Sequence, residues 1–318
     1  MPVINRGDDF FQVVTYTGNG TSQTISGLRF QPDFVWIKGR SGATDHALYD
    51  AQRGVQKRLE SNTTDAEVSS DNGVTAFNSD GFSIGSLAQV NTNGATYVAW
   101  CWKEGATQGF DIVTYTGTGA NRTVAHSLGV APKMMIIKSR SASGTSWNVY
   151  HASTGNTGAM FLEATNAFAA DSTRFNNTSP TSTDFTVGTG AGVNGSGSTF
   201  VAYLFSEVAG FSRMGSYTGN GSTDGPFVFC GFRPRFVMIK RTDVGGSWYM
   251  IDTARGTVNV VNPYLLANAA NSEATDLSWD LLSNGFKLRS TYSKINASSG
   301  TYIFAAFAEH PFKNALAR

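Results

Sequence analysis

Three glutamates are the most regular residues in this sequence that could do acid or base chemistry. Glu104, Glu207 and Glu309 each stand two residues after an aromatic residue that closes a similar stretch of chain. A glycosidase with paired carboxylates needs two acids about 5 to 10 Å apart in one cleft, but these acids recur only once in about 100 residues. We therefore favour a structural role, in which each carboxylate accepts backbone hydrogen bonds or pairs with a cation at a domain junction.

The remaining titratable groups point to no reaction. Asp50, His151 and Asp252 occupy equivalent positions after a strand-like segment, and the change from acid to imidazole suits a polar turn better than a shared mechanism. The sequence contains no nucleophile elbow, P-loop, Rossmann fingerprint or HExxH motif. No two of its histidines have metal-ligand spacing; they are His46, His126, His151 and His310. We expect a protein that is not an enzyme and that uses no metal or cofactor.

Two tryptophans are candidates for a sugar-binding platform, because an aromatic ring stacks on the apolar C–H face of a sugar. Trp147 and Trp248 stand at equivalent positions, where the first copy of the pattern has His46. Recurrence at one position is also what a core residue shows, and we favour packing over ligand binding.

Three lysines are the second set of candidate ligand-binding residues. Lys38, Lys138 and Lys240 each end a segment that begins at a repeated proline, and Arg40 and Arg140 follow two of them. They could contact an acidic surface glycan, or they could solvate a sheet edge and so discourage aggregation. We favour the second interpretation.

The two cysteines replace apolar residues of the repeated pattern. Cys101 aligns with Leu204 and Ala306, and Cys230 aligns with Leu28 and Leu128. Because the cysteines are not at equivalent positions, we expect two buried hydrophobic side chains and neither a disulfide nor a metal pair.

These residues are carried by a domain-sized repeat. The strings "YTGNG", "YTGTG" and "YTGNG" begin at Tyr16, Tyr115 and Tyr217, about 100 residues apart. Each copy contains about seven short segments rich in β-branched and aromatic residues, bounded by turn formers. The pattern predicts an all-β protein of three tandem, antiparallel, jelly-roll-like β-sandwich repeats at 9–105, 109–208 and 210–309, with an N-terminal arm at 1–8 and a C-terminal tail at 310–318.

Alternation in the closing segment of the first repeat places it inside a sheet. Tyr97, Ala99 and Cys101 point to one side of "TYVAWCW", and Val98, Trp100 and Trp102 to the other. Both sets are mainly apolar, so we expect a central strand covered on both faces. Short linkers between repeats predict close neighbours, in either a rod or a pseudo-threefold cluster.

Composition excludes several classes of partner. The formal net charge is +1 and only 15% of residues are charged, against roughly a quarter in soluble proteins. A nucleic-acid binder needs a basic face, and no apolar run approaches the ~20 residues that span a bilayer. The start of the chain lacks a charged stretch followed by an apolar one, so we expect no secretion signal.

Three strings carry a resemblance to a known group of proteins: "VVTYTGNGTSQTISGL", "NGSGSTFVAYLFSEVAGFSRMGSYTGNGSTDGPFVFCGFRPRFVMIKRTD" and "YIFAAFAEHPF". They resemble repetitive β-proteins of tailed bacteriophages, especially phages of aquatic bacteria. The resemblance implies a virion structural protein of the tail, tail-fibre or host-interaction kind. Our leading hypothesis is a tail or tail-fibre protein, made in the host cytoplasm, that attaches to host-surface glycan through loops of the β-sandwich repeats. The resemblance fixes no functional residues.

Other roles remain open at this stage. The chain has no fibre shaft, so a capsid decoration or connector protein that binds other virion subunits is the alternative, and a surface-polysaccharide depolymerase is the third. The expected partners are other virion proteins and copies of the chain itself, as a trimer or hexamer. The position in the particle and the receptor stay undecided.

Overall fold

The computed structural model describes residues 4–308, and it is all-β, with 42% of residues in strands and 6% in helices. Every strand pair is antiparallel, and no sheet contains strands from two repeats. Each repeat has a major sheet in which the first and last strands are neighbours. The major-sheet strands, in spatial order, are β1 (Phe11–Thr17), β9 (Thr96–Trp102), β3 (Phe34–Gly39) and β4 (Ala47–Asp50); β10 (Phe110–Thr116), β17 (Thr199–Phe205), β12 (Met134–Ser139), β13 (Asn148–His151), β14 (Gly155–Phe161) and β15 (Ala169–Ala170); and β18 (Ser212–Thr218), β25 (Thr301–Ala308), β20 (Pro234–Arg241), β21 (Trp248–Asp252) and β22 (Leu265–Leu266).

A smaller sheet packs on one face of each major sheet and completes the sandwich. These strands are β2 (Gln23–Ser26), β8 (Gly81–Ile84) and β7 (Val74–Asn78); β11 (Arg122–Ala125) and β16 (Asp184–Val187); and β19 (Phe227–Phe229), β24 (Gly285–Leu288) and β23 (Trp279–Leu282). The remaining elements are β5 (Lys57–Arg58), β6 (Val68–Ser69), the 3₁₀ turn η1 (Gly7–Asp9) and the single-turn helices α1 (Ala88–Asn91), α2 (Ser172–Phe175), α3 (Ala191–Asn194) and α4 (Ser293–Asn296).

The repeated YTGxG corner is held by a buried asparagine from the last single-turn helix of its repeat. In the first repeat, Tyr16 donates to the Val90 carbonyl at 2.8 Å, and Asn91 accepts from the Asn19 N–H at 2.9 Å. A Cβ on Gly18 would lie 2.3 Å from the Thr92 carbonyl oxygen, so only glycine fits there. Asn194 and Asn296 make the same bond to Thr118 and Asn220. The motif recurs because each repeat closes its sandwich with the same hydrogen-bonded corner.

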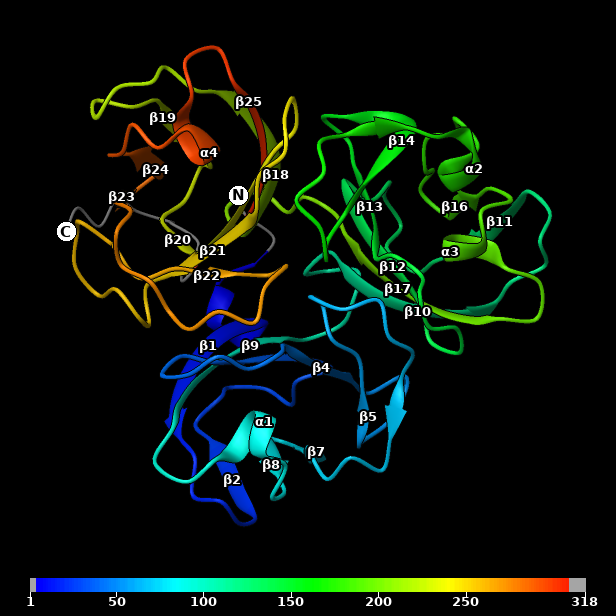
Figure 1. Cartoon of the computed structure of the whole chain (residues 1–318), viewed down its shortest axis with the longest axis horizontal. Helices are drawn as coiled ribbons and strands as arrows, with labels where there is room; N and C mark the ends of the chain where they lie inside the picture. Colours follow the sequence, from blue (N-terminus) through cyan, green and yellow to red (C-terminus); the bar gives the residue numbers. More distant parts are fainter. Residues whose placement is uncertain (1–3, 309–318) are drawn as a thin grey trace.

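The three repeats surround a common core as a pseudo-threefold cluster, with one lobe per repeat (Figure 1). The outer face of each major sheet packs into this central core, and the inner face packs against the smaller sheet of its own repeat. In β9 the prediction of two buried faces is confirmed: Val98, Trp100 and Trp102 belong to the central core, whereas Tyr97, Ala99 and Cys101 belong to the sandwich core. The central core therefore links the three sandwiches into one rigid body.

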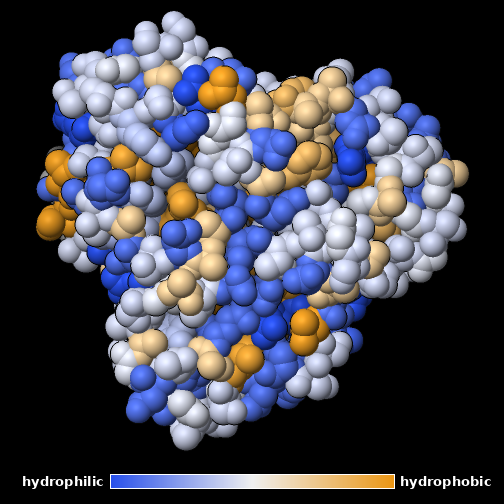
Figure 2. Space-filling model, viewed as in Figure 1, coloured by the Kyte–Doolittle hydropathy of each residue, from blue (hydrophilic) through white to orange (hydrophobic). Residues whose placement is uncertain are grey.

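Equivalent aromatic residues meet on the pseudo-threefold axis. Trp102, Phe205 and Phe307 are the closing aromatics of the three repeats, and their ring centroids lie 5.7 to 6.3 Å apart, within the range of favourable aromatic pairs. Ile4 of the predicted N-terminal arm is buried in the same core, so this part of the arm docks on its own chain. The predicted C-terminal tail, 310–318, lies outside the described residues. Hydrophilic residues gather on the surface where the lobes meet (Figure 2).

Candidate ligand groove at the junction of repeats 2 and 3

The repeated lysines lie inside the junctions between repeats and not on the surface. Lys38, Lys138 and Lys240 are each 0% exposed, so neither sequence interpretation holds: they do not solvate an edge, and a surface glycan does not reach them. Burial lowers the pKa of each ammonium group to about 8, which still leaves it charged at neutral pH. The bonds to a neighbouring repeat run from Lys38 Nζ to the Ala270 carbonyl (3.0 Å), from Lys138 Nζ to the Thr64 carbonyl (3.2 Å) and from Lys240 Nζ to the Asn166 carbonyl (2.7 Å).

The tryptophan position makes a second bond across each junction. Trp147 donates its indole N–H to the Glu60 carbonyl at 2.9 Å, and Trp248 donates to the Phe161 carbonyl at 2.8 Å. His46 makes the equivalent contact, with 2.9 Å between Nε2 and the Leu266 carbonyl oxygen. All three side chains are buried, so Trp147 and Trp248 are packing residues that cannot stack on a sugar.

The repeated glutamates join successive repeats. Glu104 accepts from the Ile112 N–H at 2.9 Å, and Glu207 accepts from the Met214 N–H at 3.0 Å; both N–H groups belong to the first strand of the next repeat. This is the structural role expected from the sequence. Glu309 lies outside the described residues. Both cysteines are buried and free, as their alignment with apolar residues predicted.

Two of the three junctions are filled by buried ion pairs. At junction 1–2, where the loops of repeat 1 meet repeat 2, Asp50 accepts from Tyr203 at 2.7 Å and pairs with Arg53 at 2.5 Å. Arg53 and Arg140 then both bind Glu67, at 3.0 and 2.9 Å. Junction 3–1 repeats the pattern; its contacts are Trp100 to Asp252 (3.0 Å), Asp252 to Arg255 (2.6 Å), Arg255 to Glu273 (3.1 Å) and Arg40 to Glu273 (2.8 Å).

Junction 2–3 lacks this network because every member is replaced. His151 takes the place of the aspartate, and Ala305, on the facing strand, takes the place of the aromatic donor. Nδ1 of His151 accepts from the Ser153 N–H, so Nε2 carries the proton and donates to the Phe304 carbonyl at 3.2 Å. Burial lowers the pKa of His151 to about 4. The aspartate and histidine of this position are thus junction residues.

The same substitutions open a cavity at junction 2–3. At this junction, Thr154 replaces the arginine that pairs with the aspartate in the other two junctions. Phe168 replaces the glutamate, and Thr242 replaces the second arginine that binds this glutamate. All three line a cavity of about 460 Å³. Hydroxyl groups dominate its wall; they come from Ser153, Thr154, Ser216, Thr218, Thr242 and Thr301.

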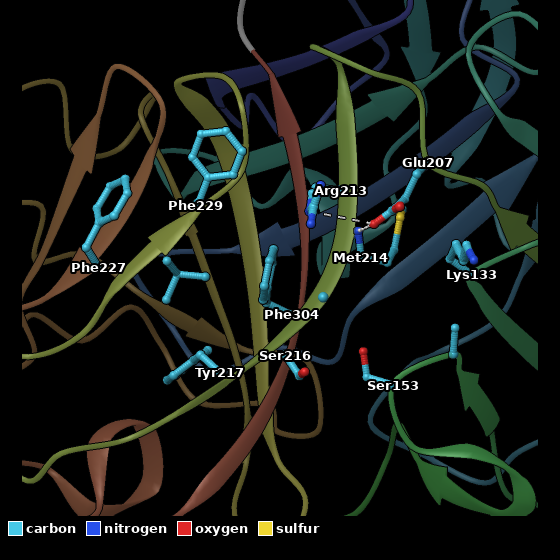
Figure 3. A pocket seen from close by; sticks show the side chains of 13 residues that line it. Lys133, Ser153, Glu207, Arg213, Met214, Ser216, Tyr217, Phe227, Phe229 and Phe304 are labelled. Atoms are coloured by element: carbon cyan, nitrogen blue, oxygen red, sulfur yellow. Dashed lines mark hydrogen bonds and ion pairs between the residues drawn. The ribbon is translucent and has the colours of Figure 1, made fainter.

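A larger cavity, of about 540 Å³, continues from this one along β18. The two cavities share Ser153, Ser216 and Tyr217, and together they form what we call the junction 2–3 groove. Its larger part lies between the edge strands β18 and β19 on one side and repeat 2 on the other. Figure 3 shows Phe227 and Phe229 on one side of this part, with Lys133 and Ser153 on the other.

The aromatic wall of the groove is unique to repeat 3. In each smaller sheet the edge strand centres on a buried residue paired with a buried phenylalanine, and in repeat 3 that central residue is Val228. Its neighbours Phe227 and Phe229 are 43% and 56% exposed. The equivalent pairs are Thr24 with Ser26, and Thr123 with Ala125. Two exposed phenylalanines on one face of an edge strand, where the other repeats have small or polar residues, are typical of a binding surface.

The strand facing them is also altered. Gly215 of β18 pairs with Phe304, where the other repeats pair Val14 with Ala99 and Val113 with Ala202. A Cβ at position 215 would come within 2.8 Å of the Phe304 ring, so glycine is required and the groove wall loses a branched side chain.

The end of β18 is left open by a proline. In the first two repeats, Gln23 and Arg122 donate to the last carbonyl of the first strand, at 3.1 and 2.9 Å. Pro226 stands at the equivalent place and has no donor. No described side chain donates to the matching carbonyl of Thr218, which lines the groove.

The groove carries two cations at positions whose charge the fold does not dictate. Lys133 and Arg213 line it, and both are exposed. Arg213 has one weak ion pair, with Nε 3.9 Å from Glu207 Oε1. At junction 1–2 the equivalent residues are Asp33 and Asp111. The same positions therefore hold two acidic residues at junction 1–2 and two basic residues at junction 2–3.

The sequence prediction missed these residues, although the repeats contain the signal. Aligning "QTIS", "RTVA" and "PFVF" shows aromatic residues at the exposed positions of the third copy only. Lys133 and Arg213 lie 80 positions apart in different repeats, so only the three-dimensional cluster brings them together.

Across residues 4–308, the fold and groove define a class: a three-sandwich β-protein with two junctions filled by ion pairs and a groove at the third. The chain belongs to a family described as a domain of unknown function, DUF7483, whose model matches residues 6–311. No curated protein matches the chain. Within residues 4–308, no helix is long and apolar enough to cross a membrane, and no three His, Cys, Asp or Glu side chains are grouped to hold a metal ion.

Proposed function

We propose that the chain is a non-enzymatic structural protein of a tailed-phage particle, placed in the tail or tail fibre, that attaches to host-surface glycan through the junction 2–3 groove. The observation that carries the proposal is the wall chemistry of this groove. Phe227 and Phe229 offer ring faces for sugar C–H groups, and the hydroxyl-lined half offers donors and acceptors for sugar hydroxyls. The virion assignment rests on the sequence resemblance.

A binding role fits the groove better than hydrolysis does. Glu207 is the one carboxylate among the residues that line its two cavities, and it is engaged with the Met214 N–H. A paired-carboxylate glycosidase requires a second acid across the cleft. A depolymerase is therefore the weakest of the three hypotheses.

The test compares the purified protein with a variant that removes only the aromatic wall. Phe227→Thr with Phe229→Ser restores the residues that repeat 1 carries at these positions. The unaltered protein should bind host cells and compete with phage adsorption, and the double variant should do neither while keeping the same melting temperature. Val130→Ser is the matched control, since Val130 is an exposed apolar residue elsewhere. Failure of the unaltered protein both to bind and to compete would overturn the proposal.

The internal threefold favours one alternative, a capsid decoration or connector protein. A single chain with three similar lobes matches a particle site of threefold or sixfold symmetry. Gold-labelled antibody on intact particles separates the two roles: label at the tail supports attachment, whereas label over the capsid supports decoration.

A further inference from the structure

We infer that the junction 2–3 groove selects an acidic oligosaccharide, with a sugar carboxylate bound between Lys133 and Arg213 and the neighbouring sugars lying over Phe227 and Phe229. This inference deepens the proposed function and rests on it. It assigns the ligand's charge and its direction along the groove.

The first step is the position of the two cations. Lys133 comes from repeat 2, directly before β12, and Arg213 comes from β18 of repeat 3; both line the larger cavity. Figure 3 shows Lys133 on the side of the cavity away from Phe227, and Arg213 near the middle, between Phe229 and the Glu207 carboxylate. Both cations line one cavity, so an extended ligand in it meets two groups that can donate to a carboxylate, and the bidentate geometry of arginine adds specificity.

The second step is that these cations are not used by the fold. The side chain of Arg213 is 47% exposed, and its contact with Glu207 at 3.9 Å is too long to be a strong pair. By contrast, Arg235, at the position equivalent to Lys133, reaches across junction 3–1 to the Val13 carbonyl at 3.2 Å. In repeats 1 and 2, Gln12 and Asp111 stand at the position of Arg213. The junction can therefore be built without either cation.

The third step is the gradient along the groove. One end combines two cations, one carboxylate and two exposed phenylalanines. The other end is lined by serine and threonine hydroxyls together with aromatic and aliphatic side chains, and none of its lining residues is charged. Such a groove fits a chain of several sugars with at least one carboxylate at the cationic end. Because the Glu207 carboxylate lies beside Arg213, a single acidic group is better matched than a dense polyanion.

The experiment measures binding of defined oligosaccharides to the full chain by calorimetry. The probes are oligomers of galacturonic acid, of mannuronic and guluronic acid, and of α2,8-linked sialic acid, each beside its carboxyl-reduced form; a phosphorylated neutral oligosaccharide is included. We expect at least one acidic probe to bind about tenfold or more tightly than its reduced form, as two charge-assisted contacts imply. Lys133→Gln and Arg213→Gln should each lose most of that preference, and higher salt should weaken it.

Matched variants separate the inference from the proposed function. Lys103→Gln, an exposed lysine outside the groove, should leave the preference unchanged, and melting temperatures should show that all variants fold. If the reduced forms bind as tightly as the acids and binding still depends on Phe227 and Phe229, the groove is a glycan site but the inference of an acidic ligand is wrong. If only the phosphorylated probe is preferred, the inference of a carboxylate ligand is likewise wrong. If no probe binds, the inference fails, and the cell-binding experiment decides separately on the proposed function.

Discussion

Glutamine at position 104 should make the protein more stable at pH 8 than the glutamate that stands there, whereas the same change at position 207 should not. The two glutamates are equivalent, and each accepts one N–H from the next repeat. Their neighbours differ in charge: Asp111 lies beside Glu104, and Arg213 beside Glu207. The pair therefore tests how charge acts at one position of the repeat.

The magnitude follows from the pKa of Glu104. Burial and the neighbouring Asp111 carboxyl raise this pKa from 4.5 to about 7, although the hydrogen bond from the Ile112 N–H lowers it. A pKa change of one corresponds to about 1.36 kcal/mol. Because Glu104 is only partly buried, solvent screening reduces the cost of its ionisation to the stability of the folded state to about 1 kcal/mol. Because the folded state holds a proton that the unfolded state releases, stability is lost as pH rises from about 4.5 to about 7. A glutamine keeps the acceptor for Ile112 and never ionises.

The assay is thermal unfolding of the unaltered protein, Glu104→Gln and Glu207→Gln at pH 4.5 and pH 8. At pH 8, Glu104→Gln should gain about 1 kcal/mol, or about 2 °C in melting temperature, and most of the gain should vanish at pH 4.5. Glu207→Gln should lose about 0.5 kcal/mol or less, as expected for an exposed ion pair. Equal effects at the two positions, or no gain from Glu104→Gln at pH 8, would refute the conclusion that burial and the neighbouring Asp111 disfavour the ionised Glu104.

Three further predictions concern the buried groups. Lys240→Met should lower the free energy of unfolding by about 2 kcal/mol, because it strips the donor from three carbonyl oxygens of the junction; urea unfolding beside the exposed Lys103→Met would show it, and equal midpoints would contradict it. Burial lowers the pKa of His46 to about 3, so its contribution to stability should be lost progressively as pH falls below 6.5; calorimetry with His46→Gln should show a shallower acid decline, and an unchanged decline would exclude His46 as its source. Burial raises the pKa of the Cys230 thiol to about 12 and that of Cys101 further; both should resist a thiol reagent such as DTNB in the native protein and react in urea, and rapid native labelling would count against the packing described.

Much of the fold was predictable because its signals are local. The alternation of Tyr97, Val98, Ala99 and Trp100 marks a strand with two apolar faces, and both faces are buried. What covers the outer face was not predictable, since Trp100 could pack against a neighbouring repeat or another chain with the same pattern. The clustering of three repeats is a property of long-range packing that no short segment encodes.

The lysines show why residue type misleads at such positions. A lysine at a strand end usually reaches solvent, and Lys38 was interpreted in that way. Its ammonium group can be buried because the Ala270 carbonyl, from another repeat, accepts a hydrogen bond from it. The acceptor lies 232 positions away, so spacing within one repeat contains no trace of it. For the groove, in contrast, comparison between repeats would have singled out Phe227 and Phe229.

Fusing three sandwiches into one polypeptide has a consequence for stoichiometry. In a homotrimer of single sandwiches, any substitution that opens one interface opens all three. A destabilising change therefore weakens the assembly at three interfaces. Here Thr154, Phe168 and Thr242 open one interface, while buried ion pairs close the other two. Two interfaces are thus held by ion pairs and the third contains the groove, so the proposed ligand binding should saturate at one ligand per chain. Under the proposed function, avidity would then depend on how many chains one particle carries.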